Sequence, residues 1–135
     1  MPIKNMTTNK VIAISSRLAD SMLSRSLGLM FSKPKQAALV LKFEKEENIS
    51  LHMAFVFYAI DVIFVNRRKE IVDIKENFKP FETYVSKRKA KYAIELPAGT
   101  VKYTKTKKGN KIEFLKVKET NYPNGKSITV TKAGR

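Results

Sequence analysis

IDVIFVNRRKEIVDIK, residues 60–75, is the stretch of sequence that decides the fold. Residues 60–66 are rich in Ile, Val and Phe, as β-strands are, and a second such run covers 70–75. The polar triplet Arg67-Arg68-Lys69 between the two runs predicts a turn, and therefore an antiparallel hairpin. The β-rich run over 50–57 ends only a few residues earlier, so the whole segment predicts a β-meander.

Strand-like segments also lie on both sides of this hairpin. They cover 10–14, 37–43, 92–96, 112–117 and 127–131. Residues 92–96 alternate apolar and polar side chains, which predicts a half-buried strand, and residues 76–88 form an aromatic loop. Asp20 precedes apolar residues at helical spacing up to Gly28, which predicts a helix of about two turns. We therefore expect a mainly β fold, a small twisted antiparallel sheet that closes into a barrel or a sandwich, with one or two short helices.

Length and composition favour one domain over residues 1–135. The chain has 135 residues, 43% of them hydrophobic, which is enough apolar material for a single core. It has no cysteine, so disulfides and thiolate metal sites are excluded, as suits a reducing compartment. The first residues lack the apolar run of a signal peptide, and the apolar stretch over 53–65 is shorter than the roughly 20 residues that cross a bilayer. The sequence thus predicts a cytoplasmic protein without a membrane span.

Charge is the strongest signal in the composition. The formal net charge is +15, and residues 87–135 hold 14 basic and 3 acidic side chains. Such an excess favours polyanionic partners. The positive field therefore belongs to the C-terminal third of the chain.

Four phrases of the sequence occur together in a known family. They are Arg25-Ser26-Leu27-Gly28-Leu29-Met30-Phe31, His52-Met53, Ile60-Asp61-Val62-Ile63-Phe64 and Glu95-Leu96-Pro97-Ala98-Gly99-Thr100. In this order they resemble the domain-of-unknown-function 192 family, and its archaeal members most, over about residues 17–114. The resemblance implies a compact, mostly β fold and no agreed activity. The basic C-terminal extension, about 116–135, lies outside it.

Two basic clusters are candidates for nucleic-acid binding. Their residues are Lys87, Arg88, Lys89, Lys91, Lys105, Lys107, Lys108 and Lys111. Flexible cations bind phosphate oxygens, and Tyr92, Tyr103 and Tyr122 lie nearby in sequence for base stacking. The alternative is a lysine-rich solvated surface of the kind found in proteins from hot environments, which would carry a more balanced supply of Glu.

A second set of residues could line a small-ligand pocket. It comprises Arg25, His52, Asp61, Phe81 and Tyr84. Asp61 interrupts an apolar run, so its carboxylate must be hydrogen-bonded, paired or solvated, and Arg25 is a candidate structural partner. The alternatives are that His52 simply packs at the start of a strand and that the aromatic loop forms a satellite hydrophobic cluster.

No catalytic constellation stands out. His52 is the only histidine, no Gly-rich phosphate loop occurs, and we predict no catalytic residue, no metal site and no cofactor. The first hypothesis is a non-catalytic binding module for RNA or a ribonucleoprotein such as the ribosome. The second is a small-ligand-binding β-barrel, for instance for a sugar, that could be enzymatic, and the third is a structural module with exposed strand edges for an acidic protein. The small-molecule ligand and the oligomeric state stay open.

Overall fold

A computed structural model gives the fold and describes residues 1–19, 37–53 and 57–133. Its elements are β1 (Ile3–Asn5), β2 (Lys10–Ala13), β3 (Ser15–Ala19), β4 (Ala37–Glu47), β5 (Ser50–His52), β6 (Ile60–Val65), β7 (Ile71–Phe78), β8 (Thr83–Val85), β9 (Ala90–Pro97), α2 (Thr100–Tyr103), β10 (Ile112–Tyr122) and β11 (Gly125–Lys132). The prediction of a mainly β fold with a short helix is confirmed. The predicted helix after Asp20 lies outside the described residues.

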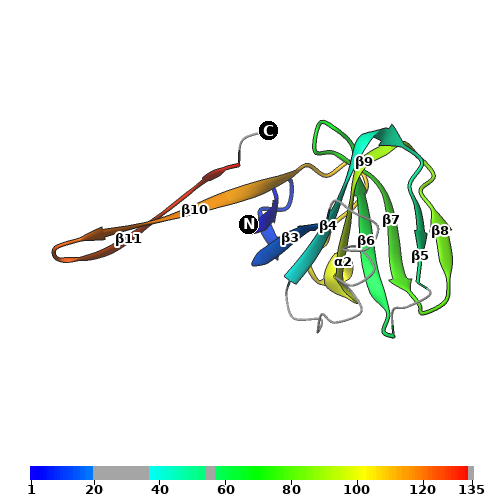
Figure 1. Ribbon diagram of the computed structural model, residues 1–135, viewed down its shortest axis with the longest axis horizontal. Coiled ribbons are helices and arrows are strands. Elements are labelled where there is room, and N and C mark those ends of the chain that lie inside the picture. The colour runs from blue at the N-terminus through cyan, green and yellow to red at the C-terminus, as the bar shows by residue number, and fades with distance from the viewer. Residues whose placement is uncertain (20–36, 54–56, 134–135) are drawn as a thin grey trace.

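The centre of the molecule is a five-stranded sheet with the order β3-β4-β9-β6-β7 (Figure 1). The predicted hairpin is confirmed as β6 and β7, which pair antiparallel from Ile60↔Phe78 to Val65↔Ile71. All six residues of β6 are buried, because this strand lies inside the sheet and is covered on both faces. The sheet is not purely antiparallel as predicted, since β3 and β4 pair parallel.

Two smaller sheets complete the fold. β11, β10, β1 and β2 form a four-stranded sheet, and β5 pairs with β8. Of the two architectures predicted, the described strands favour layered sheets like those of a sandwich, and not one closed barrel. β1 and β8 were not predicted, because each has only three residues.

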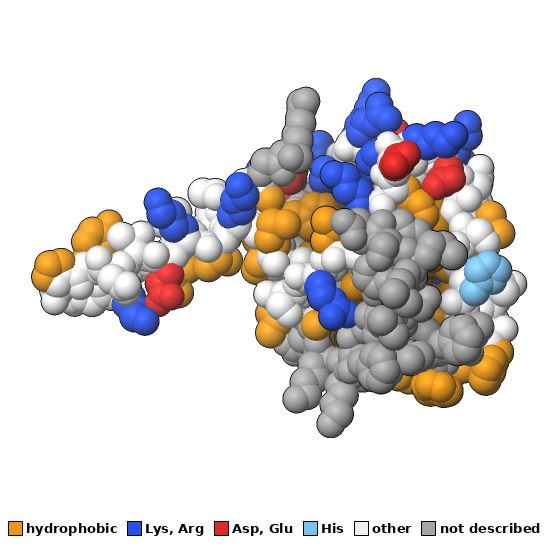
Figure 2. Space-filling model, viewed as in Figure 1, with side chains coloured by type: hydrophobic (Ala, Val, Ile, Leu, Met, Phe, Trp, Pro, Cys, Tyr) orange, Lys and Arg blue, Asp and Glu red, His pale blue; other side chains and the backbone are white. Residues whose placement is uncertain are grey.

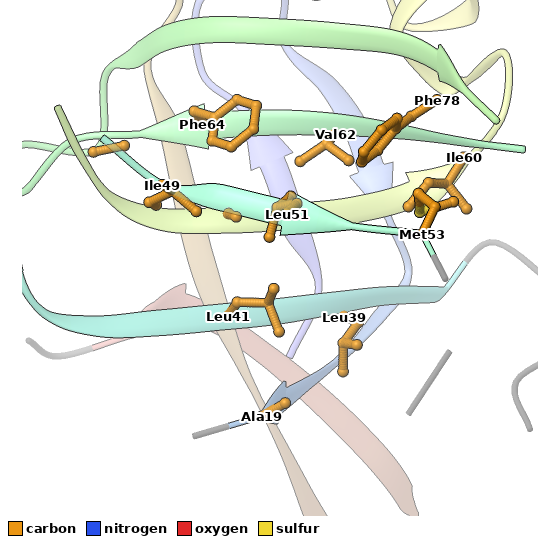
Figure 3. Close-up of a cluster of buried hydrophobic side chains, with 12 residues drawn as sticks. Ala19, Leu39, Leu41, Ile49, Leu51, Met53, Ile60, Val62, Phe64 and Phe78 are labelled. Carbon is orange, nitrogen blue, oxygen red and sulfur yellow. The ribbon is translucent and has the colours of Figure 1, made fainter. Parts of the chain in front are cut away.

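Two apolar clusters occupy opposite faces of the central sheet. The first lies between this sheet and the β5–β8 pair and is built around Phe64, Phe78, Leu51 and Met53 (Figure 3). The second lies toward β1, β2 and α2 and includes Ile3, Ile63, Ile94 and Val101. Neighbouring residues of β6 and β9 alternate between the two clusters, as the period of a strand requires.

β9 differs from its prediction. Its alternating pattern predicted a strand with one solvated face, but residues 93–96 are all buried. Glu95 is only 6% exposed and lies between Leu39 and Val62 of the neighbouring strands. The pattern misled because a charged residue at a buried position looks like a solvent-facing one.

β10 and β11 extend away from the body as a long two-stranded ribbon (Figure 1). Eight cross-strand pairs, from Leu115↔Lys132 to Tyr122↔Gly125, hold it together. Pro123 and Asn124 form its two-residue turn, as the turn-forming sequence there predicted. The predicted strands over 112–117 and 127–131 were therefore placed correctly but are longer in the structure.

Candidate nucleic-acid interface

Three loops that are distant in the sequence meet at one end of the central sheet. They are the β6–β7 turn, the segment that leads from β8 into β9, and the 107–111 turn before β10. The first and third are joined by backbone hydrogen bonds: Ile71 N–H donates to Asn110 O (2.9 Å), and Ile112 N–H donates to Lys69 O (2.9 Å). Strand pairing therefore fixes the positions of the basic turns.

Asp73 joins the second loop to the third. Its carboxylate, 1% exposed, accepts hydrogen bonds from Lys87 N–H (2.9 Å) and the Tyr84 hydroxyl (2.7 Å) through Oδ2. Its Oδ1 accepts from Ile74 N–H (2.9 Å) and lies 3.5 Å from Lys108 Nζ. One buried carboxylate thus holds the backbone of Lys87 and the side chain of Lys108 at the same place.

Ionisation supports this role for Asp73. Burial alone would raise its pKa, but the hydrogen bonds from Lys87, Tyr84 and Ile74 and the charge of Lys108 outweigh burial and lower the pKa below its ordinary value. Burial, together with the hydrogen bond to Asp73 and the Asp73 charge, raises the pKa of Tyr84 to about 12. The Tyr84 hydroxyl is therefore protonated, and able to donate, throughout the neutral range.

We expect Asp73 to make the stability of the protein depend on acid pH. Because the folded-state pKa is depressed, its contribution is complete above the unfolded value of about 3.9 and is lost as pH falls through the folded pKa. Urea unfolding of wild type should show a fall in the free energy of unfolding below about pH 4, a fall that is smaller in Asp73→Asn. The Tyr84→Phe variant should lose about 1–2 kcal/mol of the free energy of unfolding at neutral pH. Glu119→Gln, on the exposed ribbon, should have the same free energy of unfolding as wild type both at neutral pH and below about pH 4. Equal pH profiles for wild type and Asp73→Asn would contradict this assignment.

The three loops gather ten basic residues, which we call the loop patch. Its members are Arg67, Arg68, Lys69, Lys87, Arg88, Lys89, Lys91, Lys107, Lys108 and Lys111. Figure 2 shows Lys and Arg side chains gathered at one end of the body, with a few carboxylates among them. Arg67 lies 3.9 Å from Glu46, an exposed pair that contributes little stability.

Seven of the eight residues predicted for nucleic-acid binding belong to the loop patch. The exception is Lys105, which follows α2, so that the length of β9 separates it from Lys91. Arg67, Arg68 and Lys69 were missed as site residues, although their turn was predicted. The signal that could have included them is the hairpin itself, because the strand that follows Lys69 begins beside the other basic loops.

The predicted stacking aromatics have different surroundings. Tyr92 is half-buried against Phe114, with 5.7 Å between ring centroids, and Lys69 Nζ lies 5.1 Å from the Tyr92 centroid. That ring is therefore already covered. Tyr103 (86% exposed) and Tyr122 (57% exposed) present their rings to solvent, on α2 and at the tip of the ribbon.

Asp61 has a structural environment. It is 1% exposed and accepts hydrogen bonds from three backbone N–H groups, of Asn77, Gly99 and Val101, each at 3.0 Å. It thereby holds the end of β7 and the start of α2, where Gly99 adopts a positive φ of 91°. Its predicted partner Arg25 lies outside the described residues.

The other predicted pocket residues lie on the opposite side of the central sheet from Asp61. Tyr84 packs against Phe64 and Phe78, with its hydroxyl bound to Asp73. His52 is exposed on β5, and Phe81 is 74% exposed. Asp61 faces the other way because it alternates with Ile60 and Val62 of the first cluster. The four described residues are not gathered in one cavity.

An open pocket occurs elsewhere, between β2 and residues 97–104, and encloses about 690 Å³. It is mainly apolar, with Val11, Ile14 and Tyr103 exposed at its walls. The described residues contain no group of three or more His, Cys, Asp or Glu side chains placed to hold a metal ion. Over the same ranges, no helix has the length and hydropathy that membrane-spanning helices need.

Glu95 is a buried acid that the sequence interpretation did not single out. Burial, and then the charge of Glu95, raise the pKa of Tyr58, which packs against the first cluster. The burial of Glu95 left no signal in the sequence, because a glutamate in an alternating strand pattern indicates a solvent-facing position.

Comparison with known proteins gives the family. The model of the DUF192 family, described as "Uncharacterized ACR", matches residues 3–114. This chain belongs to the DUF192 family. The match contains the region predicted by resemblance and ends where β10 leaves the body of the fold.

Two relatives that are similar in sequence come from Pyrococcus species. A UPF0127 protein of Pyrococcus furiosus is 43% identical over 111 residues, which cover 82% of this chain and 95% of the relative. A UPF0127 protein of Pyrococcus horikoshii is 40% identical over 100 residues, which cover 73% of this chain and 86% of the relative. A crystal structure of a protein of unknown function from Novosphingobium aromaticivorans has a TM-score of 0.74 at 20% identity, over 84% of each chain. That likeness shows the fold alone.

Proposed function

We propose that this DUF192 member is a non-catalytic binding module that associates electrostatically, in the cytoplasm, with RNA or a ribonucleoprotein such as the ribosome. The observation that carries the proposal is the loop patch. Three loops place ten basic side chains at one end of the sheet, with buried Asp73 holding two of the loops together.

The free cations of the loop patch are what phosphate binding needs. Within the described residues, six patch members are exposed and have no carboxylate partner: Arg68, Lys87, Arg88, Lys89, Lys107 and Lys111. Long cationic side chains adapt to a phosphate backbone and release its counterions, which gives affinity without sequence readout. A merely solvated surface would pair these cations with carboxylates, as happens at Arg67.

The test is co-sedimentation of the full chain with ribosomes and RNA from a lysate, at low and high salt and after nuclease treatment. We expect the wild type to travel with the ribonucleoprotein fraction and to be released by high salt or nuclease. The variant Lys87→Ala/Arg88→Ala/Lys89→Ala should lower the affinity for purified RNA by about 10–100-fold at low salt and reduce the salt slope by about 2–3.

The matched control is Lys79→Ala/Lys102→Ala/Lys105→Ala. It removes the same charge from exposed positions after β7 and around α2, at the end of the central sheet where Ile60 pairs with Phe78 and Pro97, opposite to the loop patch. The control should retain nearly all binding. If both triple variants lose affinity equally, only the total charge matters and the loop patch is not an interface. A wild type that stays free of RNA at physiological salt would refute the proposed function.

A further inference from the structure

The ribbon of residues 115–132 reaches well beyond the rest of the fold. Phe114 is the last β10 residue paired with β1, and the base is held by hydrogen bonds from Leu115 N–H to Pro2 O (2.8 Å) and from Ala133 N–H to Phe114 O (2.7 Å). Eight residues beyond that point, at about 3.4 Å each, give a reach of about 27 Å. All eight residues of β11 are exposed. The DUF192 match ends at residue 114, so the ribbon lies outside the matched region.

The pairing register sorts the side chains of the ribbon onto two faces. Val117 lies opposite Val130, and Ile128 and Lys132 share their face, together with the ion pair of Lys126 and Glu119 (3.0 Å). The other face, which we call the lysine face, carries Lys116, Lys118, Thr120, Tyr122, Ser127, Thr129 and Thr131. The lysine face has no carboxylate.

The two faces have different roles. A two-stranded ribbon alone is marginally stable in water, and cross-strand apolar pairs such as Val117 with Val130 are what hold it together. The lysine face has no apolar pair across its two strands. It presents cations and hydroxyls to solvent, and Figure 2 shows basic side chains along the ribbon.

A second copy of the chain is a poor occupant for the ribbon. One face of about 27 Å by about 10 Å covers roughly 300 Å², well below the roughly 800 Å² per partner of a stable interface. Each copy would also bring a net charge of +15. A polyanion meets neither obstacle. Its phosphates need little apolar contact area, and its negative charge is opposite to that of the chain.

We propose that the lysine face of the ribbon lies along the minor groove of duplex RNA and contacts its phosphates and 2′-hydroxyls. This inference rests on the proposed function and names the partner's form. The minor groove of A-form RNA is wide and shallow and displays 2′-hydroxyls, which both donate and accept hydrogen bonds. The hydroxyls of Thr120, Ser127, Thr129 and Thr131 can also do both, and Lys116 and Lys118 supply the cations for the phosphates beside the groove. Lys111 of the loop patch immediately precedes β10 and pairs with Glu70, so the ribbon and the loop patch are joined through the same strand.

The experiment measures binding of the full chain to an RNA duplex of about 20 base pairs, to a DNA duplex of the same sequence and to single-stranded RNA. We expect the RNA duplex to bind about tenfold tighter than the DNA duplex. Lys116→Ala/Lys118→Ala should weaken RNA-duplex binding by about 10–100-fold and reduce the salt slope by about 2. Lys126→Ala/Lys132→Ala removes the same charge from the opposite face and should change the affinity by less than about threefold.

A third variant separates hydroxyls from charge. Thr129→Val/Thr131→Val removes two of the four hydroxyls but keeps the branched shape that strands favour, so it should reduce the preference for RNA over DNA while leaving DNA affinity unchanged. Equal losses in the two lysine variants, or tighter binding of single-stranded RNA, would overturn the ribbon proposal. Dimerisation that increases with protein concentration and is lost in Val117→Lys would also overturn the ribbon proposal. If the Lys116→Ala/Lys118→Ala and Thr129→Val/Thr131→Val variants bind RNA as wild type does and the loop-patch variant does not, the ribbon proposal fails and the proposed function stands. If wild type shows no salt-sensitive binding to any RNA, both the ribbon proposal and the proposed function are refuted.

Discussion

Replacing Asp61 with alanine should lower the free energy of unfolding by about 3–5 kcal/mol. The carboxylate is buried and satisfies three backbone N–H groups, of Asn77, Gly99 and Val101. Without it these donors lose their partner at the junction of β7 and α2, and an unsatisfied buried donor costs about 1–3 kcal/mol. Urea denaturation at neutral pH measures the effect.

Asp61→Asn serves as the comparison for Asp61→Ala. The amide keeps one acceptor oxygen but places an NH₂ group where the second oxygen stood, so we expect a loss between wild type and the alanine variant. If Asp61→Ala keeps nearly full stability, the carboxylate is not structural. The ligand-binding role considered from the sequence would then become the better explanation of its burial.

Replacing Phe64 with alanine should cost about 3–5 kcal/mol through lost burial and the cavity left behind. Phe64 on β6 is 0% exposed (Figure 3), and 5.7 Å separate the centroid of its ring from that of Tyr84 on β8. It therefore joins the central sheet to the β5–β8 pair. We expect a large fall in the urea midpoint with an unchanged slope, because the variant still unfolds as one unit.

Phe81→Ala is the control for Phe64→Ala. The Phe81 side chain is 74% exposed, so its removal should change stability by less than about 0.5 kcal/mol. A comparable loss from both substitutions would mean that the aromatic loop belongs to the core. It would also place Phe81 in the satellite cluster that the sequence suggested.

The elements predicted correctly are those defined by residues that are close together in the sequence. Ile, Val and Phe on either side of a polar turn are enough to define β6 and β7, and the turn residues before Gly125 define the ribbon tip. The parallel pairing of β3 with β4 has no local signature, because it joins segments that are apart in sequence. β8 is three residues long and lies in a segment whose Pro and charged residues indicate a loop.

The candidate interface was predicted in part for a similar reason. Lysine-rich segments are visible in any sequence, so Lys87–Lys89 and Lys107–Lys111 were found. Arg67 and Arg68 join these segments because of the strand register, and the register cannot be read from the composition of the sequence. The partners of Asp61 were missed because backbone N–H groups, which every residue except proline has, leave no trace in a residue pattern.

The position of β1 affects the order in which the protein folds during synthesis. β1 lies between β2 and β10, and Asn5 donates hydrogen bonds to Thr106 and Asn110, 101 and 105 residues away. The β1–β2 hairpin can form as soon as both strands have been translated, but one edge of β1 stays unpaired until nearly the whole chain exists. Contacts this distant slow folding, because the loop must close before they form. The first strand to be made is thus among the last to be completed, and its open edge is the part of the nascent chain most exposed to mispairing.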